Sequence, residues 1–251
     1  MLKKILLFLV FLAIFFNLNS EITQLSSILE NHIQLEYFFL GITLILIYVI
    51  PIITVLKNRI QYINKFEIIL FILSGSFIAG SFSYSIVYHL DSLIRNAYLI
   101  PLIGAIFEEF FKLFVAVILF YIFRPYITNN LFTIFILASF LGLGFQIYED
   151  YIYVLNTINL DLIEFVIALI YRISNSFTSH WMYTGIASIG LFSLFTNRFS
   201  KLKSLFWLIS PLALHILWNS SWNNSIFFVS LLSASTLIIY LFAYKELICQ
   251  D

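Results

Sequence analysis

Long apolar runs, separated by short polar segments, cover most of the chain. A helix needs about 20 mostly apolar residues, at 1.5 Å rise per residue, to cross a hydrocarbon core about 30 Å thick. Runs of that length predict spanning helices at 37–56, 68–90, 98–123, 131–155, 165–196, 204–222 and 225–244. With a shorter run near the N-terminus, they predict an all-α, polytopic transmembrane bundle of about 7–8 spans.

The run at 165–196 is too long for one straight span, and its middle is polar. A polar middle predicts a break in the helix, a re-entrant stretch or a wet cavity. The polar residues are Asn175, Ser176, Thr178 and Ser179.

The N-terminal run, Ile5 to Phe16, follows two lysines and is typical of a signal-peptide core or a short anchor. No small-x-small cleavage site follows it at residues 17–20, which favours a retained anchor. We therefore expect a signal-anchor-like segment over residues 1–20 and a single integral-membrane domain over residues 21–251.

Basic residues gather in alternate loops. If the N-terminus is inside and the spans alternate, ten of the 13 Lys and Arg residues are cytoplasmic and only Arg95 faces out. This bias predicts that both termini are cytoplasmic. The ten are Lys3, Lys4, Lys57, Arg59, Lys65, Arg124, Arg198, Lys201, Lys203 and Lys245. Acids assigned to the outer loops are Glu21, Glu30, Glu36, Asp91, Asp161 and Glu164.

Composition agrees with a membrane protein. The chain is 62% apolar and 10% charged, whereas soluble domains are about 45–50% apolar and about 25% charged. The formal net charge of zero gives no electrostatic basis for binding nucleic acid. We therefore expect the lipid bilayer as a partner and no nucleic-acid partner.

Ionisable residues nevertheless fall inside the predicted spans. Each costs about 2.5–3.5 kcal/mol on insertion scales, so such residues normally face the bundle interior or a water-filled cavity and serve a function. They are Glu108, Glu109, Lys112, Glu149, Asp150, Arg172, His180 and His215.

Their spacing predicts one site built from facing helices. Pairs at i,i+4 share a helix face, and the chain has Glu108 with Lys112, Phe145 with Glu149, His180 with Thr184, and His215 with Asn219. The first pair has the order that favours an ion pair, and Glu109 points about 100° away from Glu108. One of the two glutamates would then pair with Lys112, while the other would face the cavity. A structural bridge between Asp150 and Arg172 is also expected.

Carboxylates, two histidines and an amide in a restricted wet cavity suit hydrolysis. A glutamate acts as general base on water, and a histidine steadies that water or protonates the leaving amine. Asn219 with the second histidine would donate to the developing oxyanion. His-Glu-x-x-His is absent, which excludes that zinc helix. A Glu/His/His set from separate helices would still hold zinc with one position open, so both mechanisms stay open.

These residues resemble a known family. Glu108-Glu109-Phe110-Phe111-Lys112 looks like the EExxK motif of PrsW-type intramembrane proteases, relatives of the CAAX prenyl endopeptidases in the CPBP superfamily. The segment from Phe145 to Glu149 matches FxxxE, where the CAAX branch usually has histidine. Segments beginning at His180 and His215 resemble the two later histidine motifs. The resemblance covers residues 98–222.

The resemblance implies a glutamic-type endopeptidase that hydrolyses peptide bonds of membrane-anchored protein substrates. Some family members are site-1 proteases that cut an anti-sigma factor. This cleavage is on the outer side of the bacterial cytoplasmic membrane. Carried across by motif, Glu108 is the base and Glu109 its helper, Glu149 or His180 positions water or substrate, and His215 with Asn219 forms the oxyanion side. Lys112, Phe145 and Thr184 would support them. No cofactor is expected; if zinc is present, its ligands are Glu108, His180 and His215.

Two other functions compete with this one. A CAAX-type or bacteriocin-immunity-like membrane protease would act on another substrate class, and Glu149 argues against it. An ion- or proton-coupled transporter also uses intramembrane acids and histidines. It predicts an inverted repeat, which the sequence does not show, and substrate-dependent flux in liposomes.

Overall fold

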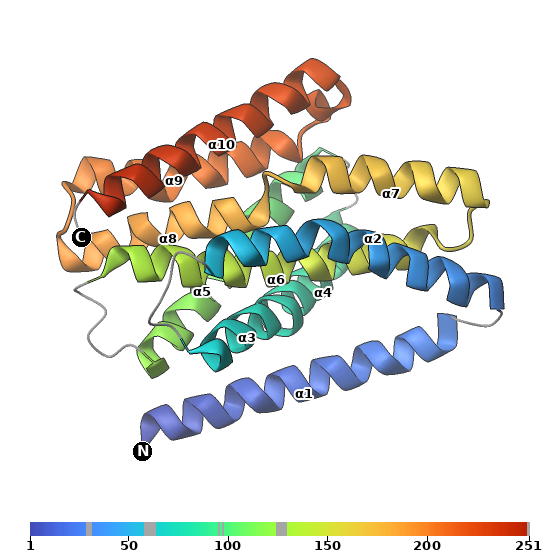
Figure 1. Cartoon of the computed structure of the whole chain (residues 1–251), viewed down its shortest axis with the longest axis horizontal. Coiled ribbons are helices and arrows are strands. Elements are labelled where there is room, and N and C mark those ends of the chain that lie inside the picture. The colour runs from blue at the N-terminus through green and yellow to red at the C-terminus, as the bar shows by residue number, and fades with distance from the viewer. Residues whose placement is uncertain (29–31, 58–63, 95, 97, 124–129, 250–251) are drawn as a thin grey trace.

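The computed structural model describes residues 1–28, 32–57, 64–94, 96, 98–123 and 130–249, and all regular structure within them is helical. Long helices follow the longest axis of the molecule, and both termini lie at the same end (Figure 1). The elements are α1 (Leu2–Ile28), α2 (His32–Lys57), α3 (Lys65–Ser74), the π-helix η1 (Gly75–Gly80), α4 (Ser81–Ile94), α5 (Leu99–Phe123), α6 (Leu131–Thr157), α7 (Leu162–Ser176), α8 (His180–Thr196), α9 (Lys201–Trp218), the 3-10 helix η3 (Ser221–Asn224) and α10 (Ile226–Ile248).

Five described helical segments are long and apolar enough to cross a membrane. They are α1, α2, the continuous unit at residues 65–94, α6 and α10. Helix α5 carries three ionisable residues at its centre, while α7, α8 and α9 are shorter, with 15, 17 and 18 residues. The all-helical, integral-membrane prediction is confirmed, whereas the number of spans and their orientation stay predictions.

Of the three alternatives for the fifth apolar run, the structure shows a break in the helix. Helix α7 ends at Ser176 and α8 begins at His180. The hydroxyl of Ser179, the residue before α8, does not cap its own helix but donates to the side chain of Gln146 on α6. This hydrogen bond connects the segment between α7 and α8 to α6, next to His180.

The N-terminal apolar run, Ile5 to Phe16, is part of helix α1, which continues to Ile28. Glu21, expected in an outer loop, lies inside α1 and is buried, so that expectation was wrong. The helix continues because its polar side chains find partners: Ser81 donates to Asn17 at 2.8 Å and Tyr148 donates to Glu21 at 2.7 Å. The division into residues 1–20 and 21–251 stays a prediction.

Helix α6 is the central element, and glycines allow its neighbours to approach closely. A Cβ atom at Gly75 would lie 2.0 Å from the carbonyl oxygen of Leu141 on α6. A Cβ at Gly142 would lie 2.4 Å from the carbonyl oxygen of His180. Because only glycine leaves room for these backbone contacts, the first turn of α8, with His180, is held against α6.

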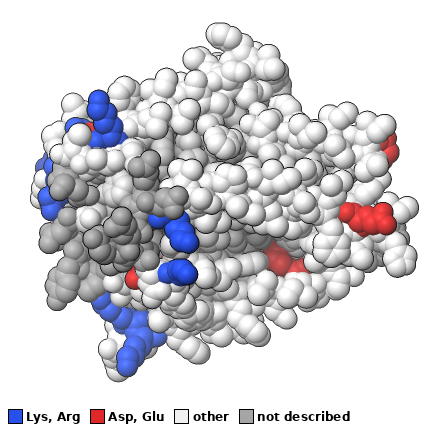
Figure 2. Space-filling view, in the orientation of Figure 1, with Lys and Arg blue, Asp and Glu red and all other residues white. Residues whose placement is uncertain are grey.

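Basic side chains gather at one end of the bundle. Lys and Arg gather at the end that carries both termini, and at the opposite end the coloured side chains are acidic (Figure 2). This separation agrees with the loop bias in the sequence. Arg59, Arg95, Arg124 and Glu30, which entered that prediction, lie outside the described residues.

Candidate active site

A cavity of about 230 Å³ lies between η1, α4, α5, α6 and α7. Glu108 from α5 and Glu149 from α6 both line it, and Arg172 from α7 lies beside them. The acids of the first two motifs therefore meet at one cavity, whereas His180, His215 and Asn219 are not among the described residues that line it. The other lining residues are Gly80, Ser83, Tyr84, Val87, Phe145, Tyr148, Ile152, Tyr153 and Asn156.

Lys112 is fully buried and holds Glu109. Its Nζ lies 2.6 Å from Glu109 Oε1, 2.9 Å from His180 Nδ1 and 4.5 Å from the centre of the Phe145 ring. The ion pair favoured by the i,i+4 order, Glu108 with Lys112, does not form, because the lysine turns toward α8 and His180. The i,i+3 residue Glu109 faces the same direction and neutralises the ammonium.

The tautomer of His180 follows from its two neighbours. An ammonium group only donates, so Nδ1 accepts from Lys112 and Nε2 carries the proton. Nε2 lies 2.7 Å from Glu149 Oε2, to which it donates. His180 therefore connects the lysine of α5 to the cavity acid of α6.

His215 has the opposite tautomer. Its Nδ1 lies 2.7 Å from Glu109 Oε1, and because a carboxylate only accepts, Nδ1 carries the proton. Its Nε2 thus presents a lone pair, 3.4 Å from Glu108 Oε2 and 3.5 Å from the Asn219 amide nitrogen. The His180 and His215 rings meet edge to face, with their centroids 4.9 Å apart.

Glu108 lines the cavity and has an unpartnered carboxylate oxygen, whereas Glu109, whose Oε2 is also buried without a donor, is not among the described lining residues. Glu108 Oε2 is buried and receives no hydrogen bond from any described residue, and 16% of its side chain is exposed, at the cavity. A carboxylate oxygen without a donor binds water, a proton or a cation readily.

The expected bridge between Asp150 and Arg172 is confirmed. Arg172 Nε lies 2.6 Å from Asp150 Oδ1, and a terminal nitrogen of the same guanidinium lies 2.5 Å from Glu149 Oε2. Asp150 also accepts from Tyr48, Gln146 and Ser176. The sequence reasoning missed these three donors. Only Gln146 had a signal, its i,i+4 spacing from Asp150; the others come from α2 and α7.

The structure places the remaining predicted residues as follows. Asn219 follows Trp218, the last residue of α9, and is the C-cap of that helix. Its amide donates to the carbonyl of Pro101 at 3.3 Å. Thr184 is fully buried and donates to the carbonyl of His180 at 2.8 Å. Thr184 therefore packs α8 against α6 and is not among the described residues that line the cavity.

Three side chains fit a metal ion. One ligand atom from each of Glu108, His180 and His215 lies within 4.8 Å of the others. The unpartnered Oε2 of Glu108 and the lone pair on His215 Nε2 are donors of the kind that zinc binds. Glu108 and His215 therefore fit zinc in the arrangement described, and His180 would join them once its Nε2 loses the proton that it donates to Glu149.

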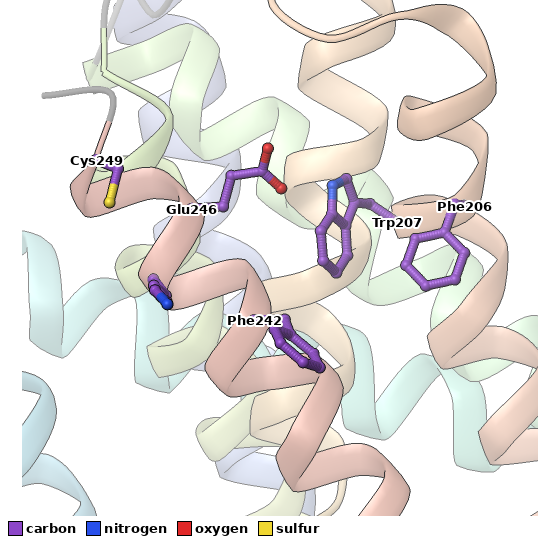
Figure 3. A pocket seen from close by; sticks show the side chains of 6 residues that line it. Phe206, Trp207, Phe242, Glu246 and Cys249 are labelled. Carbon is purple, nitrogen blue, oxygen red and sulfur yellow. The ribbon is translucent and has the colours of Figure 1, made fainter.

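A different pocket, of about 420 Å³, lies between α9 and α10 (Figure 3). Its lining is aromatic, apart from a lysine, a glutamate and a cysteine near the end of α10. It contains none of the four motifs, so the cavity at Glu108 is the candidate active site. The lining residues are Phe206, Trp207, Phe242, Lys245, Glu246 and Cys249.

Comparison with known proteins gives one match. The family model described as PrsW family intramembrane metalloprotease matches residues 66–244, which include all four motifs. No curated protein and no solved structure matches the chain.

Proposed function

The chain belongs to the PrsW family of intramembrane metalloproteases, and from that premise we propose that it hydrolyses membrane-anchored proteins with water activated by Glu108. One observation carries the choice of base. Glu108 and Glu149 line the same cavity, but only Glu108 has a buried carboxylate oxygen that no described residue neutralises or hydrogen-bonds.

Glu108 would take a proton from the attacking water as its oxygen bonds to the carbonyl carbon of the substrate. His215 Nε2, 3.4 Å away, shares that proton, and Glu109 at Nδ1 stabilises the resulting imidazolium. The proton then passes to the leaving nitrogen as the C–N bond breaks. Lys112 keeps Glu109 ionised, so both act as positioning residues for His215.

Glu149 and Asn219 would hold the substrate. Arg172 and His180 both bind Oε2 of Glu149, which leaves Oε1 to accept from the water or from a substrate amide. Asn219, beside His215, donates on the oxyanion side. These roles assign particular atoms of the motif residues to steps of the proposed hydrolysis.

If a zinc ion binds, Glu108, His180 and His215 would hold it, and it would supply Lewis-acid polarisation of the water or the substrate carbonyl. The family description as metalloprotease supports this version. The buried pair of Lys112 and Glu109 orients the histidines in either version.

The substrate class follows from the family and the membrane location. We propose a single-pass protein cut on the outer side of a bacterial cytoplasmic membrane, of which an anti-sigma factor is the example. Gathering of Lys and Arg at the end that carries both termini supports cytoplasmic termini (Figure 2).

The decisive experiment compares Glu108→Gln with Glu36→Gln, which changes an exposed acid on α2. Loss of a general base lowers the rate about 10²–10⁴-fold, so Glu108→Gln is expected to lose cleavage of a single-pass reporter in liposomes. Glu36→Gln is expected to cut at the wild-type rate. Thermal unfolding in detergent checks that both fold. Cleavage by folded Glu108→Gln at the wild-type rate would refute the assignment.

Metal removal separates the two mechanisms. The protein is treated exhaustively with chelator, its zinc content is measured by elemental analysis, and reporter cleavage is followed before and after zinc is returned. Lost activity that zinc restores identifies the metal-assisted mechanism. Full activity in zinc-free protein identifies direct catalysis by Glu108.

A further inference from the structure

A second polar cavity, of about 360 Å³, adjoins the catalytic cavity on the side of α1. Two residues, Tyr84 and Tyr148, line both cavities and so form the wall between them. Tyr148 is set close against the backbone of η1, because a Cβ at Gly80 would lie 2.6 Å from its ring. The two cavities are therefore neighbours, separated by these two side chains.

Glu21 of α1 is the only acid among the described residues that line this second cavity. It is 7% exposed. Its Oε1 accepts from the Tyr148 hydroxyl at 2.7 Å, and Tyr151 also lies near the carboxylate. Its Oε2 is buried and receives no hydrogen bond from a described residue. Such an oxygen is costly to bury unless a donor reaches it.

The rest of the lining suits a cation that carries several N–H donors. No lysine or arginine is among the described lining residues, and His89 is the one basic side chain among them. Neutral polar groups surround it, including Asn17, Gln24 and Ser85. Ammonium and guanidinium groups donate several hydrogen bonds at once, and their bonds to carboxylate are about twice as strong as neutral ones.

We propose that this cavity is a substrate subsite for a lysine or arginine side chain, and that Glu21 is the residue that selects it. The proposal rests on the proposed proteolysis, because the basic residue belongs to the polypeptide whose peptide bond lies at Glu108. Adjacency of the two cavities at Tyr84 and Tyr148 favours a substrate side chain over a separate small ligand. Helix α1 lies outside residues 66–244, so the family match does not rest on Glu21.

The test uses single-pass reporters with a neutral juxtamembrane segment, in which one lysine is moved through successive positions. Each lysine reporter has a partner with glutamine at the same position. The protein is reconstituted in phosphatidylglycerol and phosphatidylcholine, whose headgroups carry no primary amine. Mass spectrometry gives the cut site and the rate. At one position, wild type is expected to cut the lysine reporter about tenfold faster or more, the ratio that about 1.4 kcal/mol produces.

Glu21→Gln keeps an acceptor for Tyr148 and removes the charge, so the lysine-to-glutamine ratio is expected to fall toward one. Glu36→Gln, an exposed acid on α2, is expected to keep the wild-type ratio. A ratio that stays at the wild-type value in Glu21→Gln, or a wild-type protein that is indifferent to lysine at every position, overturns the subsite.

Binding to a Glu108→Gln background separates this proposal from the proteolysis. In nanodiscs, this variant is expected to bind the lysine reporter more tightly than the glutamine reporter, and adding Glu21→Gln is expected to remove the difference. If wild type cuts no reporter but this difference is present, the protease proposal fails and the subsite stands. If the binding difference is absent, the subsite fails whatever the protease does.

Discussion

Two neighbouring glutamates of α5 have opposite surroundings. Glu109 is 5% exposed and its Oε1 accepts from Lys112 and His215, whereas Glu108 lines the cavity and has only His215 Nε2, at 3.4 Å, beside its Oε2. Helix α6 repeats this division: Asp150 is 1% exposed and has donors from four residues, while the side chain of Glu149 is 36% exposed at the cavity. Successive helical residues point about 100° apart, so each adjacent pair supplies one structural acid and one cavity acid.

Charged side chains inside this bundle are stabilised by pairing with side chains of opposite charge. Buried charges are tolerated where they are paired and hydrogen-bonded, and each inner acid has a cationic partner and at least one further donor. Lys112 and Arg172 each bind an inner acid, and each is linked to the cavity acid Glu149, directly for Arg172 and through His180 for Lys112. Changes to the inner members should therefore reduce stability, and changes to the cavity acids should reduce activity.

The largest stability effect is expected for Lys112→Met. Removing one partner of a buried ion pair leaves the other charge uncompensated and costs about 3–5 kcal/mol. Chemical unfolding in detergent micelles measures this loss against wild type. Adding Glu109→Gln to the same chain removes the stranded charge and should recover part of the stability. If Lys112→Met unfolds at the wild-type denaturant concentration, the inner pair is not a structural element.

Asp150→Asn is expected to cost less, about 1.5–3 kcal/mol, the range for hydrogen bonds to charged groups. Asparagine keeps the shape and one acceptor, but Arg172 loses one of its two ionic partners and keeps Glu149. The matched variant is Glu149→Gln, which should lose reporter cleavage while its unfolding stays closer to wild type. An inverted result, with Glu149→Gln less stable and Asp150→Asn inactive but stable, would contradict the division of roles on α6.

The smallest effect is expected for Lys203→Met. Lys203 pairs with Glu246 between α9 and α10, but the lysine side chain is 42% exposed. Exposed pairs contribute about 0–1 kcal/mol, so its unfolding should differ little from wild type. Measured beside Lys112→Met, it shows that burial of the pair, and not the loss of a lysine as such, accounts for the larger effect. Equal losses in the two variants would contradict that explanation.

Prediction from sequence was most successful where it depended on residues close together in the chain. The lengths of the apolar runs predicted the described helices to within a few residues over most of the chain, and the polar residues near Ser176 predicted the break before His180. The bridge of Asp150 to Arg172 was also expected and is present. Spacing within one helix failed for Lys112, since i,i+3 and i,i+4 partners are both within reach and a contact from another helix made the choice.

The sequence by itself therefore determined that the chain is helical, belongs in a membrane and carries four short motifs, because run length and ionisable positions are properties of single segments. Tertiary structure alone decided that Lys112 binds Glu109, that His215 turns its lone pair toward Glu108, and that Glu21 lies buried against Tyr148. Those outcomes depend on how helices distant in sequence rotate and pack against α6. The closest approaches, set by glycines such as Gly142, fix which polar atoms meet.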